Sequence, residues 1–167
     1  MPVPIPAHDY PERENPREAG SLRKPRVLFI CVHNSVRSQI AEGYLRARYS
    51  DLFDAASAGS EPRGVHPLAV AVMNEIGIDI SGHRSKLVDE FFSRGIDIVV
   101  TVCDCEHQTC PFFLGVRETI HAGFPDPSAG EELSRGRITR FREVRDAITS
   151  WIDQMFVPGY GQLRIRQ

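Results

Sequence analysis

Two short apolar runs constrain the fold of this chain most. They span residues 27–32 and 96–102 and consist largely of β-branched and other apolar residues. Runs this short and this apolar are typical of strands that are buried on both faces of a sheet. Weaker strand candidates cover residues 53–57 and 118–121, so we expect about four strands.

The segments between these strands repeat apolar residues at helical spacing. The pattern covers residues 38–49, 67–76, 87–95 and 138–155, and it predicts amphipathic helices. Strands that alternate with helices imply right-handed crossovers and a parallel sheet. We therefore expect an α/β protein, a single-domain four-stranded parallel sheet with helices on both faces. Such a fold is a three-layer sandwich of the flavodoxin-like kind.

Length and composition fit one domain with a tail. The chain has 167 residues, of which 41% are hydrophobic and 25% are charged, ordinary values for a globular domain. Half of its 12 prolines lie in the first 25 residues, together with many charges, which is typical of a disordered segment. We expect a tail over residues 1–25, a domain over 26–157 and a C-terminal tail over 158–167.

Charge and hydropathy exclude several functional classes. The net charge of -2 argues against broad binding to nucleic acid or anionic membranes, which requires a basic surplus. No apolar run approaches membrane-spanning length, and the N-terminus lacks the apolar core of a secretory signal. We expect a cytoplasmic monomer with neither nucleic acid nor membrane as a partner.

The loop Cys31–Ser38, which reads CVHNSVRS, connects the first apolar run to the first predicted helix. Backbone N–H groups in such a turn can form an anion-binding nest, and the helix N-terminus adds its positive dipole end. Arg37 supplies a planar fork that matches two oxyanion oxygens, and the same field favours a thiolate at Cys31. The loop predicts a site where Cys31 attacks a tetrahedral oxyanion. The alternative is a buried strand-end cysteine followed by an unrelated arginine.

The rest of this loop provides candidate oxyanion-binding and loop-bracing residues. They are Val32, His33, Asn34, Ser35, Val36 and Ser38. The side chains of Asn34 and Ser38 can brace the loop and donate to the thiolate. Because a nest is built mainly from backbone donors, we expect His33 to point outward into solvent.

Three of the four cysteines, Cys103, Cys105 and Cys110, lie within eight residues after the second apolar run, and His107 lies among them. A redox relay would pass a disulfide between these thiols by exchange. A Cys3His zinc site is a second interpretation, although its ligands are very close in sequence. A third interpretation is that these thiols are inert, but it does not explain why three cysteines lie in a polar loop. Cys105 is either a bystander or the resolving thiol in place of Cys110, and a Cys103–Cys105 bridge would close a small, strained ring that is easily reduced.

Residues 27–45, VLFICVHNSVRSQIAEGYL, resemble the phosphate-binding loop and first helix of the low-molecular-weight protein tyrosine phosphatase superfamily. They are more narrowly similar to its thioredoxin-coupled arsenate reductases, because Gln39 stands where the phosphatase branch usually has proline. The resemblance covers about residues 26–157. It implies the phosphatase fold, an arsenate or phosphate ligand and thioredoxin as partner. It implies no cofactor, since thiols supply the electrons.

The resemblance also assigns residues outside the first loop. Cys103 and Cys110 match two relay cysteines seven residues apart, and Asp126, in an Asp-Pro pair, matches the general acid of the superfamily. Residues 128–130 (Ser-Ala-Gly) lack the aromatic side chains that line a tyrosine pocket, which favours a small inorganic substrate.

Three further residues match the surroundings of an ion in some reductases. Glu42 and Ser57 match positions that hold a potassium ion, and Lys86 falls where those proteins have an acid. The Lys86 ammonium either stands in for this ion or is a solvated helix charge. We expect no metal site beyond these neighbours.

These assignments imply an arsenate reductase. Cys31 attacks arsenic, Asp126 protonates the departing oxygen, and Cys103 attacks Cys31 and releases arsenite. Cys110 then takes over the disulfide, which thioredoxin reduces. One alternative is a phosphatase that uses Cys31, Arg37, Asp126 and water, which leaves the second loop without a role. Another is a non-enzymatic oxyanion or metal sensor.

Overall fold

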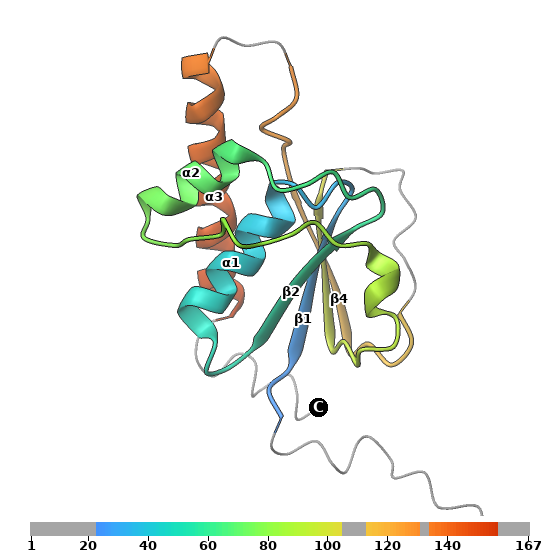
Figure 1. Cartoon of the computed structure of the whole chain (residues 1–167). Coiled ribbons are helices and arrows are strands. Elements are labelled where there is room, and N and C mark those ends of the chain that lie inside the picture. Colours follow the sequence, from blue (N-terminus) through green and yellow to red (C-terminus); the bar gives the residue numbers. More distant parts are fainter. Residues whose placement is uncertain (1–22, 105–112, 131–133, 157–167) are drawn as a thin grey trace, which may run out of the picture.

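The residues that the structure describes form a four-stranded parallel sheet with the strand order β2-β1-β3-β4 (Figure 1). The structure is a computed structural model and describes residues 23–104, 113–130 and 134–156. The strands are β1 (Arg26–Cys31), β2 (Asp54–Gly59), β3 (Ile98–Cys103) and β4 (Glu118–Phe124). The predicted α/β class, the parallel sheet and its four strands are confirmed.

The two faces of the sheet are covered unequally. The helices α1 (Arg37–Tyr49), α2 (Pro67–Glu75) and α3 (Ser134–Met155) lie on one face, where they pack against Val27 and Phe29 of β1 (Figure 1). Leu28 and Ile30 point to the other face, which is covered by η1 (Val88–Phe91), a one-turn 3-10 helix. Among the described residues, no helix is long and apolar enough to cross a membrane.

The helix predicted over residues 87–95 is wrong in type and length. Only four residues are helical, and backbone bonds of the i to i+3 kind, such as Phe92 N–H to the Asp89 carbonyl, hold the segment. Val88 and Phe91 are three residues apart and are both buried, whereas Phe92 remains largely exposed. A three-residue repeat of burial suits a 3-10 turn. The prediction assumes the longer repeat of an α-helix, which these residues do not follow.

Two residues before β1 contact the rest of the structure. The Arg23 guanidinium donates to the Asp97 carboxylate at 2.7 and 3.0 Å, and Lys24 donates to the Ser50 carbonyl. Arg23 and Lys24, which the sequence assigns to the predicted tail, thus contact residues of the predicted domain. The rest of that predicted tail and the predicted C-terminal tail lie outside the described residues.

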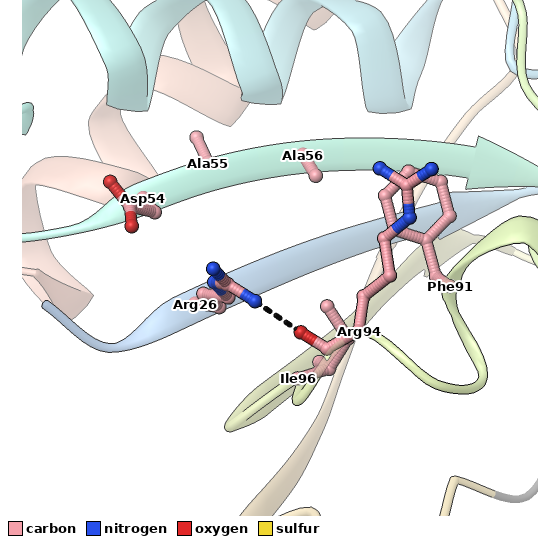
Figure 2. Close-up of a pocket in the computed structure, with 7 residues that line it drawn as sticks. All are labelled: Arg26, Asp54, Ala55, Ala56, Phe91, Arg94 and Ile96. Atoms are coloured by element: carbon pink, nitrogen blue, oxygen red, sulfur yellow. Dashed lines mark hydrogen bonds between the residues drawn. The ribbon is translucent and has the colours of Figure 1, made fainter. Parts of the chain in front are cut away.

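Parallel strands bring the carboxyl ends of β1 and β3 to one edge of the sheet, which we call the cysteine edge because it carries Cys31 and Cys103. In open α/β sheets this edge is where ligands bind. A pocket of about 260 Å³ lies at the opposite edge, beside the start of β1 and β2 (Figure 2). Six residues of strand, at roughly 3.3 Å each, separate the two ends of β1. The pocket is therefore not part of the cysteine edge.

Candidate functional site

The oxyanion loop, Cys31–Ser38, turns at Asn34. Asn34 has a φ of 48°, the left-handed conformation that asparagine tolerates better than most residues. Gly59 at the end of β2 lies against this turn, and a Cβ there would be 2.5 Å from the Val32 carbonyl oxygen and 2.9 Å from the Asn34 nitrogen. The close approach of two backbones therefore requires glycine at position 59.

Segment 61–66 is hydrogen-bonded to the loop from outside. The N–H groups of Glu61, Arg63 and His66 donate at 2.8, 3.1 and 3.0 Å to the carbonyls of Val32, His33 and Ser35. The Ser35 hydroxyl donates to the Gly64 carbonyl at 2.7 Å. These bonds use the loop carbonyls on the outer side, so they do not compete for the loop N–H groups that an anion-binding nest requires.

The Cys31 thiol is buried among donors. The Asn34 N–H donates to Sγ at 3.2 Å, and the Ser38 hydroxyl lies 2.8 Å from Sγ. The Asn34 side-chain amide donates to that hydroxyl at 2.7 Å, which leaves the hydroxyl hydrogen for the sulfur. Helix α1 begins at Arg37, and Val36 provides no side-chain cap. All these groups stabilise negative charge at Cys31.

Asn34 is the hub of a buried polar network behind the thiol. Its side-chain amide also donates to Ser57 at 2.9 Å, and Ser57 donates to Glu42. Its side-chain oxygen accepts from Gln39 and from the Lys86 backbone N–H, both at 2.9 Å. Both ends of the amide are satisfied, so the left-handed turn at Asn34 is held in place.

Glu42, Ser57 and Lys86 do lie together. The Lys86 ammonium is 3.3 Å from the Glu42 carboxylate, and Arg46 contacts the other carboxylate oxygen at 2.6 Å. The reading of Lys86 as a solvated helix charge is wrong, because its side chain is 12% exposed. Lys86 belongs to an extended segment whose carbonyl accepts from the Gly59 N–H, and this directs its side chain inward toward Glu42.

Arg37 connects the oxyanion loop to the ends of β3 and β4. Its guanidinium is almost fully buried, and one terminal nitrogen, NH1, donates to the Phe124 carbonyl at 2.9 Å and to Asp104 at 3.1 Å. The other, NH2, lies 3.8 Å from the Asp126 carboxylate. The structure therefore brings Arg37 and Asp126 together, although 89 residues of sequence separate them.

Asp126 is held in its ionised form. Burial pushes the pKa of its carboxyl upward, but two hydrogen bonds from Ser128 and the charges of Arg37 and His33 outweigh burial and lower this pKa. An acid with a lowered pKa is a carboxylate at neutral pH. In the oxyanion-free protein Asp126 is therefore a proton acceptor.

The sequence predicts that His33 points outward into solvent, and the structure differs from this prediction. It is half-buried, and its Nδ1 lies 3.2 Å from the Glu61 carbonyl oxygen. It is also near enough to Asp126 for its charge to lower the pKa of that carboxyl. His33 thus contacts segment 61–66, and its charge acts on the acid.

Cys103 ends the strand next to Cys31. In the register of β1 and β3, Ile30 pairs with Thr101, so Cys103 lies one residue beyond the level of Cys31. Neighbouring strands about 4.8 Å apart with this offset give a Cα separation of roughly 6 Å, but side chains one residue out of register point to opposite faces of a regular sheet. Both cysteines are buried in the same hydrophobic cluster. The two thiols therefore share one edge of the sheet and one buried cluster, and a disulfide between them requires the end of β3 to move.

The remaining residues of the second loop lie outside the described part of the chain. They are Cys105, His107 and Cys110, so the choice between a relay and a zinc site stays a prediction for them. Within the residues that the structure describes, no group of three or more His, Cys, Asp or Glu side chains could hold a metal ion.

Three residues of the site were not assigned a role from the sequence. Gln39 is fully buried and donates to the Asn34 carbonyl at 3.1 Å as well as to its side chain. Asp104 pairs with Arg37, and Gly59 admits the loop. The available signals were weak: a glycine that closes a strand, and an acid that directly follows Cys103.

Fold and site together define a cysteine-based, oxyanion-binding α/β protein. Residues 26–164 match the family model described as low molecular weight phosphotyrosine protein phosphatase. The chain belongs to this family.

Several relatives carry a narrower name. An arsenate reductase from Halalkalibacterium halodurans is 41% identical over 127 residues, which cover 76% of this chain and 91% of that protein. The structure of an arsenate reductase in the phosphate binding state has a TM-score of 0.64 at 31% identity, over 78% of this chain and 95% of that one. A thioredoxin-dependent arsenate reductase from Corynebacterium glutamicum has a TM-score of 0.63 at 28% identity, over 90% and 68%.

Proposed function

We propose that this chain reduces arsenate to arsenite and passes the resulting disulfide to thioredoxin. One observation carries the proposal: a thiol in an oxyanion loop, Cys31, lies at the same edge of the sheet and in the same buried cluster as a second thiol, Cys103. Phosphate ester hydrolysis needs the first thiol and has no use for the second. The names of the relatives agree with the proposal.

The first half of the cycle uses Cys31, Arg37 and Asp126. Arg37 and the loop N–H groups bind arsenate, and the Cys31 thiolate forms a sulfur–arsenic bond as one arsenate oxygen leaves as water. Asp126 delivers the proton to that oxygen. Because Asp126 is ionised before arsenate binds, the added negative charge beside it must raise the pKa of its carboxyl so that it holds this proton.

The second half transfers two electrons from thiols. Cys103, as a thiolate, attacks the Cys31 sulfur, and the electron pair of the sulfur–arsenic bond stays on arsenic, which leaves as arsenite. Cys110 then attacks Cys103, which restores the Cys31 thiolate and leaves a Cys103–Cys110 disulfide. Thioredoxin reduces this disulfide. The cycle needs no flavin and no bound metal, and it fits a monomer in the cytoplasm, where thiols are kept reduced.

The Lys86 ammonium takes the place of a monovalent cation beside Glu42 and Ser57. Its contact with the Glu42 carboxylate and the burial of both side chains support this assignment. Equal stability and activity in potassium and sodium chloride at the same ionic strength are expected. A requirement for potassium would contradict the assignment.

The test is arsenate-dependent NADPH oxidation in the presence of thioredoxin and thioredoxin reductase. The parent protein should sustain oxidation, Cys103→Ser and Cys110→Ser should abolish it, and Cys105→Ser is the matched control that should retain it. Phosphatase activity without arsenate-dependent oxidation, with thioredoxin or glutaredoxin, would favour the phosphatase that the Cys31, Arg37 and Asp126 geometry also allows.

A further inference from the structure

Arg37 is partly occupied before any oxyanion binds. Both N–H bonds of its NH1 are in use, one by the Phe124 carbonyl and one by the Asp104 carboxylate at 3.1 Å. On NH2 the nearest carboxylate, that of Asp126, lies at 3.8 Å, which is beyond hydrogen-bond distance. An oxyanion that binds both terminal nitrogens must therefore take a donor from Asp104.

The two partners differ in how easily they can move. The Arg37 side chain is 8% exposed, whereas the Asp104 side chain is 57% exposed. A displaced Asp104 carboxylate enters water with little desolvation penalty, but a displaced Arg37 would leave a buried cation unpaired. When an oxyanion takes both terminal nitrogens, Asp104 is therefore the partner that moves, and Arg37 stays in place.

Asp104 is also the residue directly after Cys103. The ladder between β3 and β4 is irregular there, with a register shift between Thr101 and Cys103. The Arg37–Asp104 pair therefore holds the residue that follows Cys103, next to an irregular part of the β3–β4 ladder.

We propose that Asp104 and the oxyanion compete for Arg37, so that oxyanion binding releases the chain segment that carries Cys103. Asp104 is then a positioning residue. Through its pair with Arg37, it holds the segment that carries Cys103 in place. Once an oxyanion displaces Asp104 from Arg37, this segment can move. The inference rests on the proposed function, because it assumes that the Cys31–Ser38 loop binds an oxyanion.

Competition has a measurable consequence in binding. Calorimetric titration of the reduced full-length protein with inorganic phosphate should show that Asp104→Asn binds phosphate roughly two- to fivefold more tightly than the parent, as expected for the loss of a partly exposed ion pair. The control is Asp51→Asn, which removes the same charge from an exposed turn at the opposite end of the sheet and should leave the affinity unchanged. A substitution that damages the fold would weaken phosphate binding, so tighter binding by Asp104→Asn indicates competition for Arg37.

Release has a second consequence, which is measured at Cys103 itself. Labelling with iodoacetamide, followed by mass spectrometry of the peptide that contains Cys103, should be faster with phosphate than without it in the parent. In Asp104→Asn it should already be fast without phosphate.

Three outcomes would overturn the inference. If Asp104→Asn binds phosphate no more tightly than the parent, Asp104 and the oxyanion do not compete for Arg37. If phosphate does not change the labelling rate of Cys103 in the parent, oxyanion binding does not release the segment. In either case the proposed function stands. No phosphate binding by the parent or the variant would remove the oxyanion site itself, and the proposed function with it.

Discussion

Asn34 shows how much of the site depends on single residues. Its left-handed backbone points an N–H at the Cys31 sulfur, while its side chain reaches Ser38 and Ser57. One residue thus shapes the loop and connects the nucleophile to the buried charges of Glu42.

Gly59→Ala tests the loop shape at this scale. The new Cβ would lie 2.5 and 2.9 Å from backbone atoms of Val32 and Asn34, which cannot move as a flexible side chain does. We expect a loss of about 1–3 kcal/mol in the free energy of unfolding and weaker phosphate binding, measured by urea denaturation and calorimetry. Gly82→Ala is the control, since a Cβ at Gly82 has no atom within 4 Å. Equal effects of both changes would contradict the close-approach argument.

Asp126→Asn tests the general acid. Asparagine keeps the size of the side chain but cannot deliver a proton, so formation of arsenite should slow by about 10²–10⁴-fold. Phosphate binding should persist, because Arg37 and the loop N–H groups remain. A rapid-quench measurement of arsenite from one turnover checks the rate, and a variant as fast as the parent would remove Asp126 from the mechanism.

Lys86→Met tests the buried charges behind the thiol. Removal of the ammonium leaves the Glu42 carboxylate with Arg46 as its remaining cation. We expect a loss of about 1–3 kcal/mol in unfolding free energy, since breaking a buried pair leaves a charge poorly compensated. Lys86→Met with Glu42→Gln should recover part of this loss in urea denaturation. A double variant that loses the sum of both single effects would contradict the pairing.

At the scale of elements, the Asp97 carboxylate holds the amino ends of β1, β3 and β4 together. Asp97 precedes β3, accepts from the Arg26 N–H at the start of β1 at 2.8 Å, and lies 3.7 Å from Arg117 just before β4. It also pairs with Arg23. Asp97 thereby connects the amino ends of β1, β3 and β4, opposite the cysteine edge.

Asp97 makes the stability of the domain depend on pH. Burial pushes the pKa of its carboxyl upward, but hydrogen bonds from Arg23 and Arg26 and the charges of Arg23 and Arg117 outweigh burial and lower this pKa. A folded-state pKa below the unfolded value of about 3.9 contributes stability above that pH, and the contribution disappears as the pH falls through the folded-state pKa.

Asp97→Asn should therefore be less stable than the parent by about 1–3 kcal/mol at pH 7, and the difference should shrink below pH 4. Urea denaturation of both proteins from pH 7 to pH 3 measures this. A difference that is constant across the range would contradict a role for the ionised carboxylate.

The sequence predicts elements well where period and length agree, as in β1, β3 and α3. It fails at residues 88–91, where a three-residue repeat of burial resembles one turn of an α-helix. For the site, Cys31, Asn34 and Arg37 are predictable because they share one loop. The contacts of Lys86 and Asp104 are not, since they depend on how separate strand ends meet in space.

At the scale of the whole molecule, the sheet separates two tasks. Its helix-covered face and amino ends provide stability, while the cysteine edge collects Cys31, Arg37, Cys103 and Asp126 from three strand ends and one helix start. The central claim is that this edge joins oxyanion binding to thiol oxidation within one chain.

A single turnover without any reductant tests this claim most directly. Fully reduced protein is mixed with excess arsenate, and arsenite and remaining thiols are counted. We predict one arsenite released and two thiols lost per chain, and neither in Cys31→Ser or Cys103→Ser. Arsenite formation by Cys103→Ser at the parent's rate and yield, or no thiol loss in the parent, would contradict the account.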